Sequence, residues 1–208
     1  MSYGYLGDTS TSIKQQVKNA GVLSVSDVLD LKGKGQLGGS LELIEEQTVS
    51  GTPSAVEFIN LANNPYDVYF LQVFNIQTSA SSQLKLTFSN NNGSSYVSTG
   101  YNRVNQFGTV AGSFGIAGAT NQTDISTQLL SSTNINSTAN GYMYLYNFLD
   151  SSKYSCVTYQ NFSAWTDVRM AFGGSFLPTA ETHNAFKLVP SAGTFLAGNF
   201  KLYGMKQI

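Results

Sequence analysis

Residues 142–149 have the sequence YMYLYNFL, in which aromatic and aliphatic side chains alternate and no residue is charged. Side chains alternate between the two faces of a strand, so Tyr142, Tyr144, Tyr146 and Phe148 are expected on one face and the Met and Leu residues on the other. A strand that is apolar on both faces lies either inside a β-sandwich, covered on its outer side, or at a subunit interface. We predict a strand here. Both positions stay open for the four aromatic residues, which are our candidate subunit interface.

Strand patterns continue on both sides of this segment, from Ser40 to the end of the chain. Leu84, Leu86 and Phe88 alternate with polar residues, which is typical of a half-buried strand. The segment 98–123 is rich in Gly, Asn and Thr and is expected to be a long surface loop. Strands are expected at 41–45, 55–61, 66–76, 83–89, 142–149, 154–159, 168–172, 185–189 and 193–205.

Roughly nine or ten short strands separated by turns favour a sandwich or a jelly roll. No repeat of about 20 to 50 residues is visible, which argues against propellers and solenoids. The fold class predicted from the sequence is therefore an all-β jelly-roll sandwich, preceded by an N-terminal arm with a short helix.

Residues 1–39 differ from the rest and are predicted to form a docking arm, with the jelly-roll domain at 40–208. Ser24 to Asp27 has the S-x-x-D form of a helix-capping box, and Gly33 ends the short helical pattern. A helix this short is marginal in water unless its apolar side packs against a partner. The side chains expected to dock are Val25, Val28 and Leu29.

The charged fraction is unusually low for a folded chain. Only 11% of the 208 residues are charged, against about 25% in an average soluble protein. The hydrophobic share is 41%, so the missing charged residues are replaced by polar uncharged residues and Gly, and not by additional core residues. The formal net charge is −1, whereas nucleic-acid binding requires clustered Lys and Arg, so no nucleic-acid partner is predicted. An aromatic share of 12% argues against disorder.

The expected compartment follows from what the sequence lacks. Cys156 is the single cysteine, so no internal disulfide is expected. The first residues have neither the basic nor the apolar region of a secretory signal, and no apolar run approaches the roughly 20 residues of a membrane span. We expect folding in a reducing cytoplasm, but the uncharged, Tyr-rich composition is typical of assembled or extracellular proteins. A virion protein, which lysis releases, fits both observations.

Catalytic chemistry finds little support in the sequence. His183 is the single histidine, which argues against metal sites with two imidazoles, and we expect it in a surface loop. Cys156 lies in an alternating strand pattern and is expected to be a buried structural thiol. The candidate carboxylates for a glycosidase pair are scattered along the chain: Glu42, Glu45, Glu46, Asp67, Asp124, Asp150, Asp167 and Glu181. We predict no catalytic residue, no metal and no cofactor.

Three stretches carry a resemblance to a known group of proteins. The start, MSYGYLGDTSTS at 1–12, resembles the N-termini of phage tail-fibre proteins. VKNAGVLSVSDVLDL at 17–31, followed by GGSLELIEEQTVSG at 38–51, resembles the junction between arm and domain in such proteins, and GTFLAGNFKLYGMK at 193–206 resembles their closing strand. The chain is thus similar to small jelly-roll structural proteins from tailed phages of marine and freshwater bacteria, cyanophages among them. The resemblance implies a jelly roll, assembly as trimers or higher oligomers, and no catalysis.

Three functions follow as alternatives. The first is a non-enzymatic virion component of the tail-fibre, baseplate or adaptor type, anchored by its arm. The second is a capsid decoration (cement) protein. The third, from another class, is a carbohydrate-binding module or glycan-active enzyme. The expected partners are further copies of the chain in a trimer, other virion proteins and, for a host-facing domain, a surface glycan. The expected location is the virion, after synthesis in the host bacterial cytoplasm.

Overall fold

The structure, a computed structural model, describes residue 26 and residues 41–134, 138–164 and 168–205. The chain divides into two compact units, Met1–Leu41 and Glu42–Ile208, and almost all of the described residues belong to the second. Of the helix expected after Ser24, only Ser26 is described, and Val25, Val28 and Leu29 lie outside the described residues.

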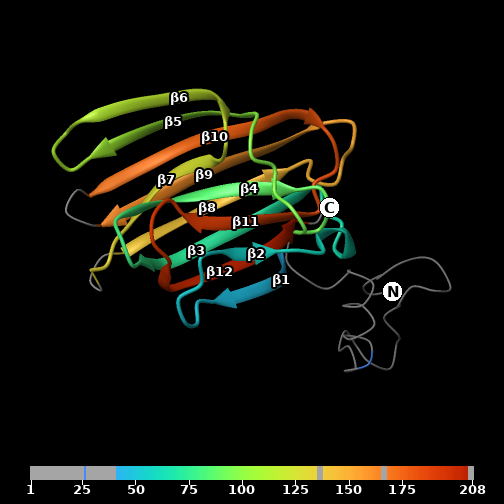
Figure 1. The fold of residues 1–208 in the computed structure, drawn as a ribbon, viewed down its shortest axis with the longest axis horizontal. Helices are drawn as coiled ribbons and strands as arrows, with labels where there is room; N and C mark the ends of the chain where they lie inside the picture. The colour runs from blue at the N-terminus through green and yellow to red at the C-terminus, as the bar shows by residue number, and fades with distance from the viewer. Residues whose placement is uncertain (1–25, 27–40, 135–137, 165–167, 206–208) are drawn as a thin grey trace, which may run out of the picture. The chain divides into compact units, whose positions relative to one another are not determined.

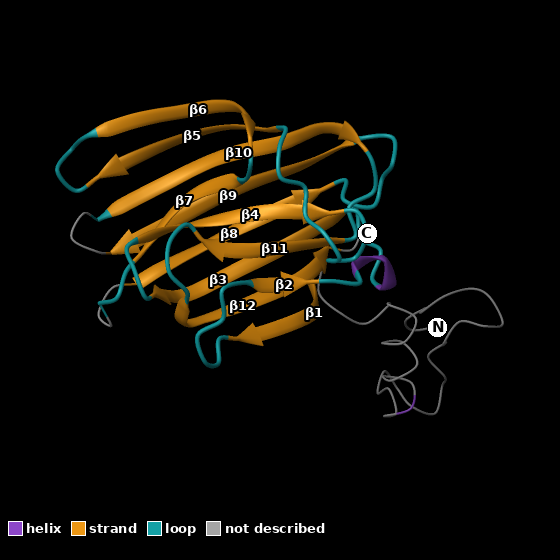
Figure 2. Cartoon of the chain, viewed as in Figure 1, coloured by secondary structure: helices purple, strands orange, loops and turns teal. Residues whose placement is uncertain are grey.

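The prediction of an all-β fold is confirmed (Figures 1 and 2). Between the described strands β2 and β3, a 3-10 turn is formed by Leu61–Asn63. The strands are β1 (Leu41–Thr48), β2 (Val56–Phe58), β3 (Val68–Thr78), β4 (Ser82–Ser89), β5 (Tyr101–Thr109), β6 (Phe114–Gln122), β7 (Ile125–Ser131), β8 (Thr138–Tyr146), β9 (Tyr154–Ala164), β10 (Arg169–Ala180), β11 (Ala185–Pro190) and β12 (Phe195–Met205).

The strands form two sheets. The larger has eight strands in the order β1-β12-β3-β8-β9-β10-β5-β6, and the smaller has four in the order β2-β11-β4-β7. The pairings between β3 and β8, β9 and β10, and β4 and β11 are antiparallel, as are the others with a defined register. Figure 1 shows the smaller sheet lying across the larger one, and β7 packs against β9 and β10.

The core lies between the two sheets. Leu71 and Val73 of β3 and Met143 and Leu145 of β8 point into it because they hold alternate positions of their strands. The smaller sheet contributes Leu84, Leu86, Phe88, Phe186 and Leu188. Each such side chain contributes about 1.5–3 kcal/mol when it is fully buried. The described core is continuous and contains residues from both sheets.

The prediction of a surface loop at 98–123 is wrong, because β5 and β6 form a hairpin there. Gly112 has a φ of 79° and donates its N–H to the Thr109 carbonyl (3.0 Å), while the Thr109 N–H donates to the Ser113 carbonyl (2.9 Å). A three-residue hairpin turn that ends in a left-handed Gly has this pattern. In β6, Gly and Ala occupy every second position, so little hydrophobic alternation was visible in the sequence. Strand β7 was also missed.

Candidate functional site

The register of the larger sheet aligns side chains on the side turned away from the core. One row of residues runs from β12 to β6 through Tyr203, Phe70, Tyr144, Thr158, Gly174, Val104 and Gly118. The next row runs through Lys201, Gln72, Tyr142, Gln160, Phe172, Gln106 and Ile116. We call the part of this surface formed by β3, β8, β9, β10, β5 and β6 the outer face.

The outer face carries no charged side chain among the described residues of its six strands. The first charge in the row beyond β3 is Lys201 of β12, whose Nζ lies 3.3 Å from Glu46 Oε1. The residues of the outer face are Val68, Phe70, Gln72, Phe74, Asn140, Tyr142, Tyr144, Tyr146, Tyr154, Cys156, Thr158, Gln160, Phe162, Met170, Phe172, Gly174, Phe176, Asn102, Val104, Gln106, Gly108, Phe114, Ile116, Gly118 and Thr120.

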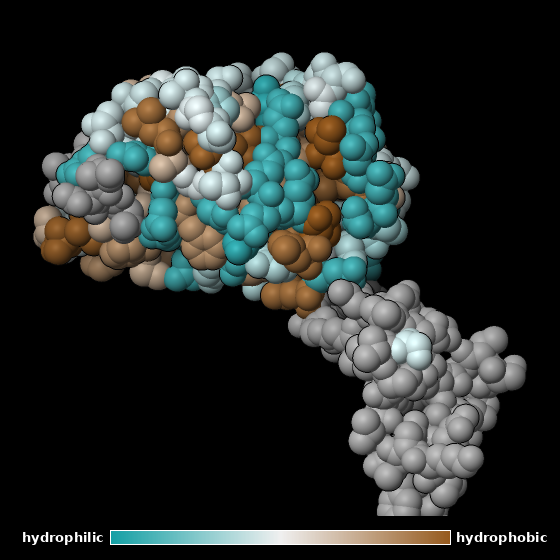
Figure 3. Space-filling view, turned by 90° about the horizontal axis from the view of Figure 1, so that it is seen from below, coloured by the Kyte–Doolittle hydropathy of each residue, from teal (hydrophilic) through white to brown (hydrophobic). Residues whose placement is uncertain are grey.

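Many of these side chains are apolar and open to solvent. The exposed fraction is 81% for Phe114, 76% for Ile116, 58% for Val104 and 52% for Phe172. Apolar patches also reach the surface in the view from below, where brown areas alternate with teal bands (Figure 3). Monomeric proteins rarely expose a contiguous apolar area larger than a few hundred Å², and larger areas indicate interaction sites. The outer face is therefore the strongest candidate for a functional surface.

The predicted tyrosines form the centre of an aromatic cluster on this face. The ring of Phe70 lies 4.9 Å from that of Tyr144 and 5.8 Å from that of Tyr142, and the rings of Tyr144 and Tyr146 are 6.3 Å apart. The Tyr142 hydroxyl donates to Gln160 Oε1 (2.7 Å). Phe70 is buried beneath the three half-buried tyrosines. The structure thus places Tyr142, Tyr144 and Tyr146 together on a pre-ordered surface.

Phe148 does not belong to this cluster, and its assignment to the same face is wrong. Asn147 has a φ of 59°, which breaks the two-residue alternation just after β8. Phe148 consequently turns into the core, where it is fully buried and its ring lies 4.7 Å from that of Phe88. A fully buried side chain cannot contact another subunit.

The far half of the outer face, on β10, β5 and β6, was not predicted from the sequence. The spacing of Met170 and Phe172 at alternate positions was a usable signal, whereas β6 gave little hydrophobic alternation beyond Phe114 and Ile116. Cys156 also lies here, half-buried beside a shallow hollow of about 650 Å³ that Val104 and Phe176 line, so its expected place in the core is wrong. Its strand position is outward because Ser155 and Val157 on either side point into the core. Partial burial raises the pKa of the Cys156 thiol.

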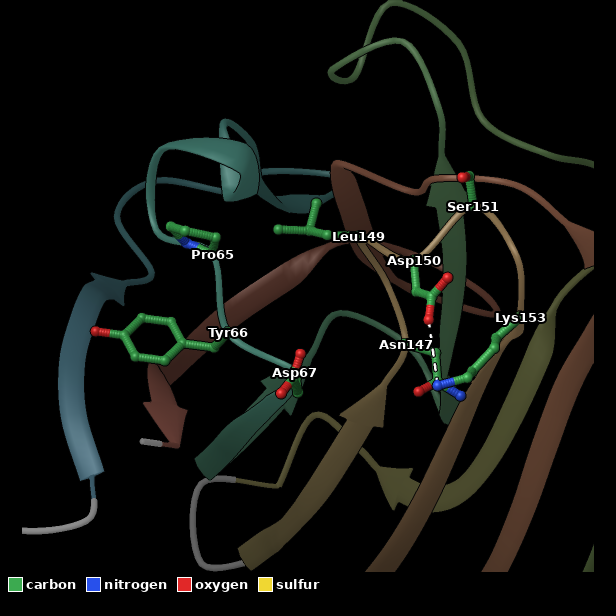
Figure 4. A pocket seen from close by; sticks show the side chains of 8 residues that line it. All are labelled: Pro65, Tyr66, Asp67, Asn147, Leu149, Asp150, Ser151 and Lys153. Atoms are coloured by element: carbon green, nitrogen blue, oxygen red, sulfur yellow. Dashed lines mark ion pairs between the residues drawn. The ribbon is translucent and has the colours of Figure 1, made fainter. Parts of the chain in front are cut away.

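A second hollow, of about 550 Å³, lies at one end of the sandwich and is polar (Figure 4). Loops before β3 and after β8 bring Tyr66, Asp67, Asn147, Asp150 and Lys153 to it. Two of the candidate carboxylates, Asp67 and Asp150, thus line the same pocket.

The state of Asp150 does not suit acid catalysis. Its carboxylate accepts hydrogen bonds from the Ser152 N–H (2.8 Å) and hydroxyl (2.6 Å) and lies 3.3 Å from Lys153 Nζ. These contacts lower the pKa of Asp150, the Ser152 hydroxyl being the largest cause, whereas a general acid requires a raised one.

His183 lies in the core, and its expected position on the surface is wrong. The backbone N–H of His183 donates to the Phe148 carbonyl (2.6 Å), and the His183 ring lies 5.3 Å from the Phe88 ring. These two contacts hold the loop against the core. Its Nδ1 is 2.7 Å from Ser155 Oγ, and its Nε2 is 3.3 Å from Glu181 Oε1.

This Ser-His-Glu arrangement does not have the geometry of a hydrolase triad. In such triads the carboxylate binds Nδ1 and the serine binds Nε2, whereas the positions are reversed here. Ser155 and His183 are also completely buried, so a substrate has no access to the hydroxyl. Burial lowers the pKa of His183, against a smaller opposing effect of Glu181. The cluster therefore serves the packing of the core.

The described part of the chain offers neither a metal-binding cluster nor a membrane-spanning helix. Within 41–134, 138–164 and 168–205, no group of three or more His, Cys, Asp or Glu residues could hold a metal ion. The helices described there and at residue 26 include none long and apolar enough to span a membrane. Comparison with protein-family models, curated proteins and solved structures finds no match for this chain.

Proposed function

We propose that the chain is a non-enzymatic structural protein of an assembled particle, in which the outer face packs against further copies of the chain. The main support for this proposal is the outer face, whose six strands direct no charged side chain to it and on which Phe114, Ile116 and Val104 are largely exposed. Leaving this area in water is unfavourable by about 25 cal/mol for each Å² of apolar surface. Interfaces are depleted in charge at their centres and enriched in Tyr and Phe, as this face is.

The strand order supports a jelly roll as the finer description of the sandwich. If the β5–β6 and β9–β10 hairpins are left aside, four strands remain in each sheet, in the orders β1-β12-β3-β8 and β2-β11-β4-β7. Successive members of this set of eight alternate between the sheets except from β4 to β7. Two interlocked Greek keys have this arrangement, and they define the jelly roll. In this description the two hairpins are additions that widen one sheet and create most of the outer face.

The particle we propose is a bacteriophage virion, and the support for this setting is the sequence resemblance at 1–12, 17–31, 38–51 and 193–206. The arm at 1–39 would attach the chain to other virion proteins, and the domain would assemble as a trimer. An appendage of the tail-fibre, baseplate or adaptor type is our first choice, and a capsid decoration protein is the alternative.

A second candidate function, glycan binding, rests on the end hollow. Asn147, Asp150 and Lys153 offer polar groups there (Figure 4). The Tyr66 ring is directed toward β1, where its hydroxyl donates to Glu42 Oε2 (2.8 Å). A small-molecule site needs a few polar groups that converge on one concave surface. Binding of host-surface polysaccharide that is lost in Asp150→Ala, with no release of reducing ends, would favour this function over the structural one.

The aromatic cluster provides the test of the structural proposal. Tyr144→Asp places a charge in the middle of the outer face, and Tyr144→Phe is the matched control because it keeps the ring. We expect the wild-type chain and Tyr144→Phe to sediment as the same oligomer and Tyr144→Asp to have a lower mass, with an unchanged circular dichroism spectrum. An oligomer that survives Tyr144→Asp with an intact fold would contradict packing through this face.

A further inference from the structure

The two sheets end in four edge strands, and three of them are protected. An edge strand presents unpaired N–H and C=O groups, which proteins guard with charges, short length or a covering element. β1 carries Glu42, Glu45 and Glu46, and β2 is three residues long. β7 is largely buried and packs against β9 and β10.

The fourth edge strand, β6, has none of these protections within the described chain. It is nine residues long, from Phe114 to Gln122, and contains neither a charged residue nor a proline. Phe114 and Ile116 are 81% and 76% exposed. A long, uncharged and apolar edge is suited to pairing with another strand.

The hairpin geometry shows which backbone groups of β6 are open. Thr109 donates its N–H to the Ser113 carbonyl, so these two residues form a hydrogen-bonded pair. Hydrogen-bonded and non-hydrogen-bonded pairs alternate along an antiparallel ladder. Gly108 opposite Phe114, Gln106 opposite Ile116 and Val104 opposite Gly118 are therefore non-hydrogen-bonded pairs. Phe114, Ile116 and Gly118 direct their N–H and C=O groups away from β5, toward the open edge.

We propose that β6 pairs antiparallel with β6 of a second copy of this chain, across a two-fold axis near the middle of the strand. This partner goes beyond the assembly proposed above, because the contact uses the edge of the sheet and not its outer face. Two identical edges match in length and satisfy each other completely, whereas a foreign strand would leave its own far edge open. Self-pairing also brings no like charges together, because β6 has none.

The pairing also joins the apolar surfaces of the two copies. Even-numbered residues of β6 lie on the outer face, and a two-fold pairing in which even positions oppose even positions places them on the same side. Phe114 and Ile116 of both copies would then continue one charge-free surface across the joint. The two larger sheets would form one continuous sheet.

Gly118 provides a matched pair of variants. Gly118→Pro removes an N–H that β5 does not use, and proline is tolerated at sheet edges. Gly118→Ala keeps the N–H, and its Cβ would meet only the Arg103 carbonyl at 3.7 Å, an ordinary contact. In sedimentation velocity we expect Gly118→Ala to match the wild-type mass and Gly118→Pro to lose the two-fold contact, halving the mass of any species that depends on it. An unchanged mass in a folded Gly118→Pro protein would overturn the pairing.

Amide hydrogen exchange on the wild-type chain decides the question without any variant. Pairing predicts slow exchange at Phe114, Ile116 and Gly118 that becomes faster on dilution, whereas an open edge predicts fast exchange at every concentration, which would overturn it. The outcome for Tyr144→Asp separates the two proposals. If Tyr144→Asp lowers the mass and Gly118→Pro does not, the edge pairing is wrong and the outer-face proposal stands. If Gly118→Pro lowers the mass and Tyr144→Asp does not, the outer-face proposal is wrong and the edge pairing stands.

Discussion

Asn147 illustrates how single residues decide which face of the sheet a neighbour occupies. Among the residues that the structure describes, six non-glycine residues have positive φ, and five of them are asparagines: Asn60, Asn75, Asn92, Asn121 and Asn147. Asparagine tolerates the left-handed region better than most residues because its short side chain bonds locally. The period of two correctly predicted a common face for Tyr142, Tyr144 and Tyr146. It failed for Phe148 because the sequence does not show that Asn147 takes a left-handed conformation.

His183 was mispredicted for a different reason. Its neighbours Thr182 and Asn184 are polar and suggested a surface loop. The loop instead lies over the core, and the hydrogen bond of His183 with Ser155 makes burial of the ring possible. That partner is far away in the sequence, so no local pattern could have identified it.

Burial of His183 predicts a loss of stability at mildly acidic pH. Its folded-state pKa is lowered by burial, so the unfolded chain takes up the proton at a higher pH than the folded one. The contribution is fully present above the unfolded pKa of about 6.5, and it falls as the pH drops from there toward the folded pKa, by up to about 1.4 kcal/mol for each pH unit. We expect urea midpoints of the wild-type chain to fall between roughly pH 7 and pH 5. In His183→Gln this part of the slope should be absent, and an equal slope in both would contradict the argument.

Within single elements, glycine occurs both in turns and inside strands, and the sequence alone did not distinguish these two positions. In the hairpin of β5 and β6, Gly112 makes the turn at positive φ, but Gly108, Gly115 and Gly118 lie within the strands. All four contributed to the prediction of a loop. Glycine in a strand often marks a close approach of another chain segment, which only the fold reveals.

Strand β10 allows this distinction to be tested at two adjacent glycines. A Cβ at Gly173 would lie 2.6 Å from the Val104 carbonyl and 2.8 Å from the Tyr159 hydroxyl, on the crowded inner side. A Cβ at Gly174, on the outer face, would meet nothing closer than the Val157 carbonyl at 3.3 Å. We expect Gly173→Ala to cost about 1–3 kcal/mol of unfolding free energy through overpacking and Gly174→Ala to cost clearly less. Urea denaturation of the two variants measures the difference, and equal costs would argue against the close packing at Gly173.

For the whole molecule, local patterns predicted strands but not their partners. The strongly alternating segments, such as Leu84 to Ser89, gave the all-β class correctly. The division into eight and four strands depends on pairings such as β3 with β12 and β8, which join distant parts of the chain. The extent of the outer face depends on the same pairings, because β10, β5 and β6 add their apolar side chains only when they lie next to β9.

The predicted division of the chain into an arm at 1–39 and a domain at 40–208 can be tested by removing the arm. The hydrophobic core of the described chain, including the residues packed against it, begins at Ile44 and draws on both sheets. A chain starting at Ser40 therefore keeps that core, and we expect it to stay soluble and to melt cooperatively. It should fail to enter particles, because Val25, Val28 and Leu29 are lost, and their burial in a groove would contribute about 1.5–3 kcal/mol each.

Two full-length variants separate the effect of losing the apolar side chains Val28 and Leu29 from the effect of adding charge to the arm. Val28→Asp combined with Leu29→Asp should reproduce the incorporation defect of the shortened chain. Ser10→Asp combined with Ser12→Asp adds the same charge to the arm without replacing Val28 or Leu29 and should enter particles normally. Repetition across a symmetric oligomer multiplies the effect of each arm, so the loss should be steep rather than gradual. A shortened chain that aggregates would show that the arm supports the core, and one that enters particles normally would show that attachment runs through the domain.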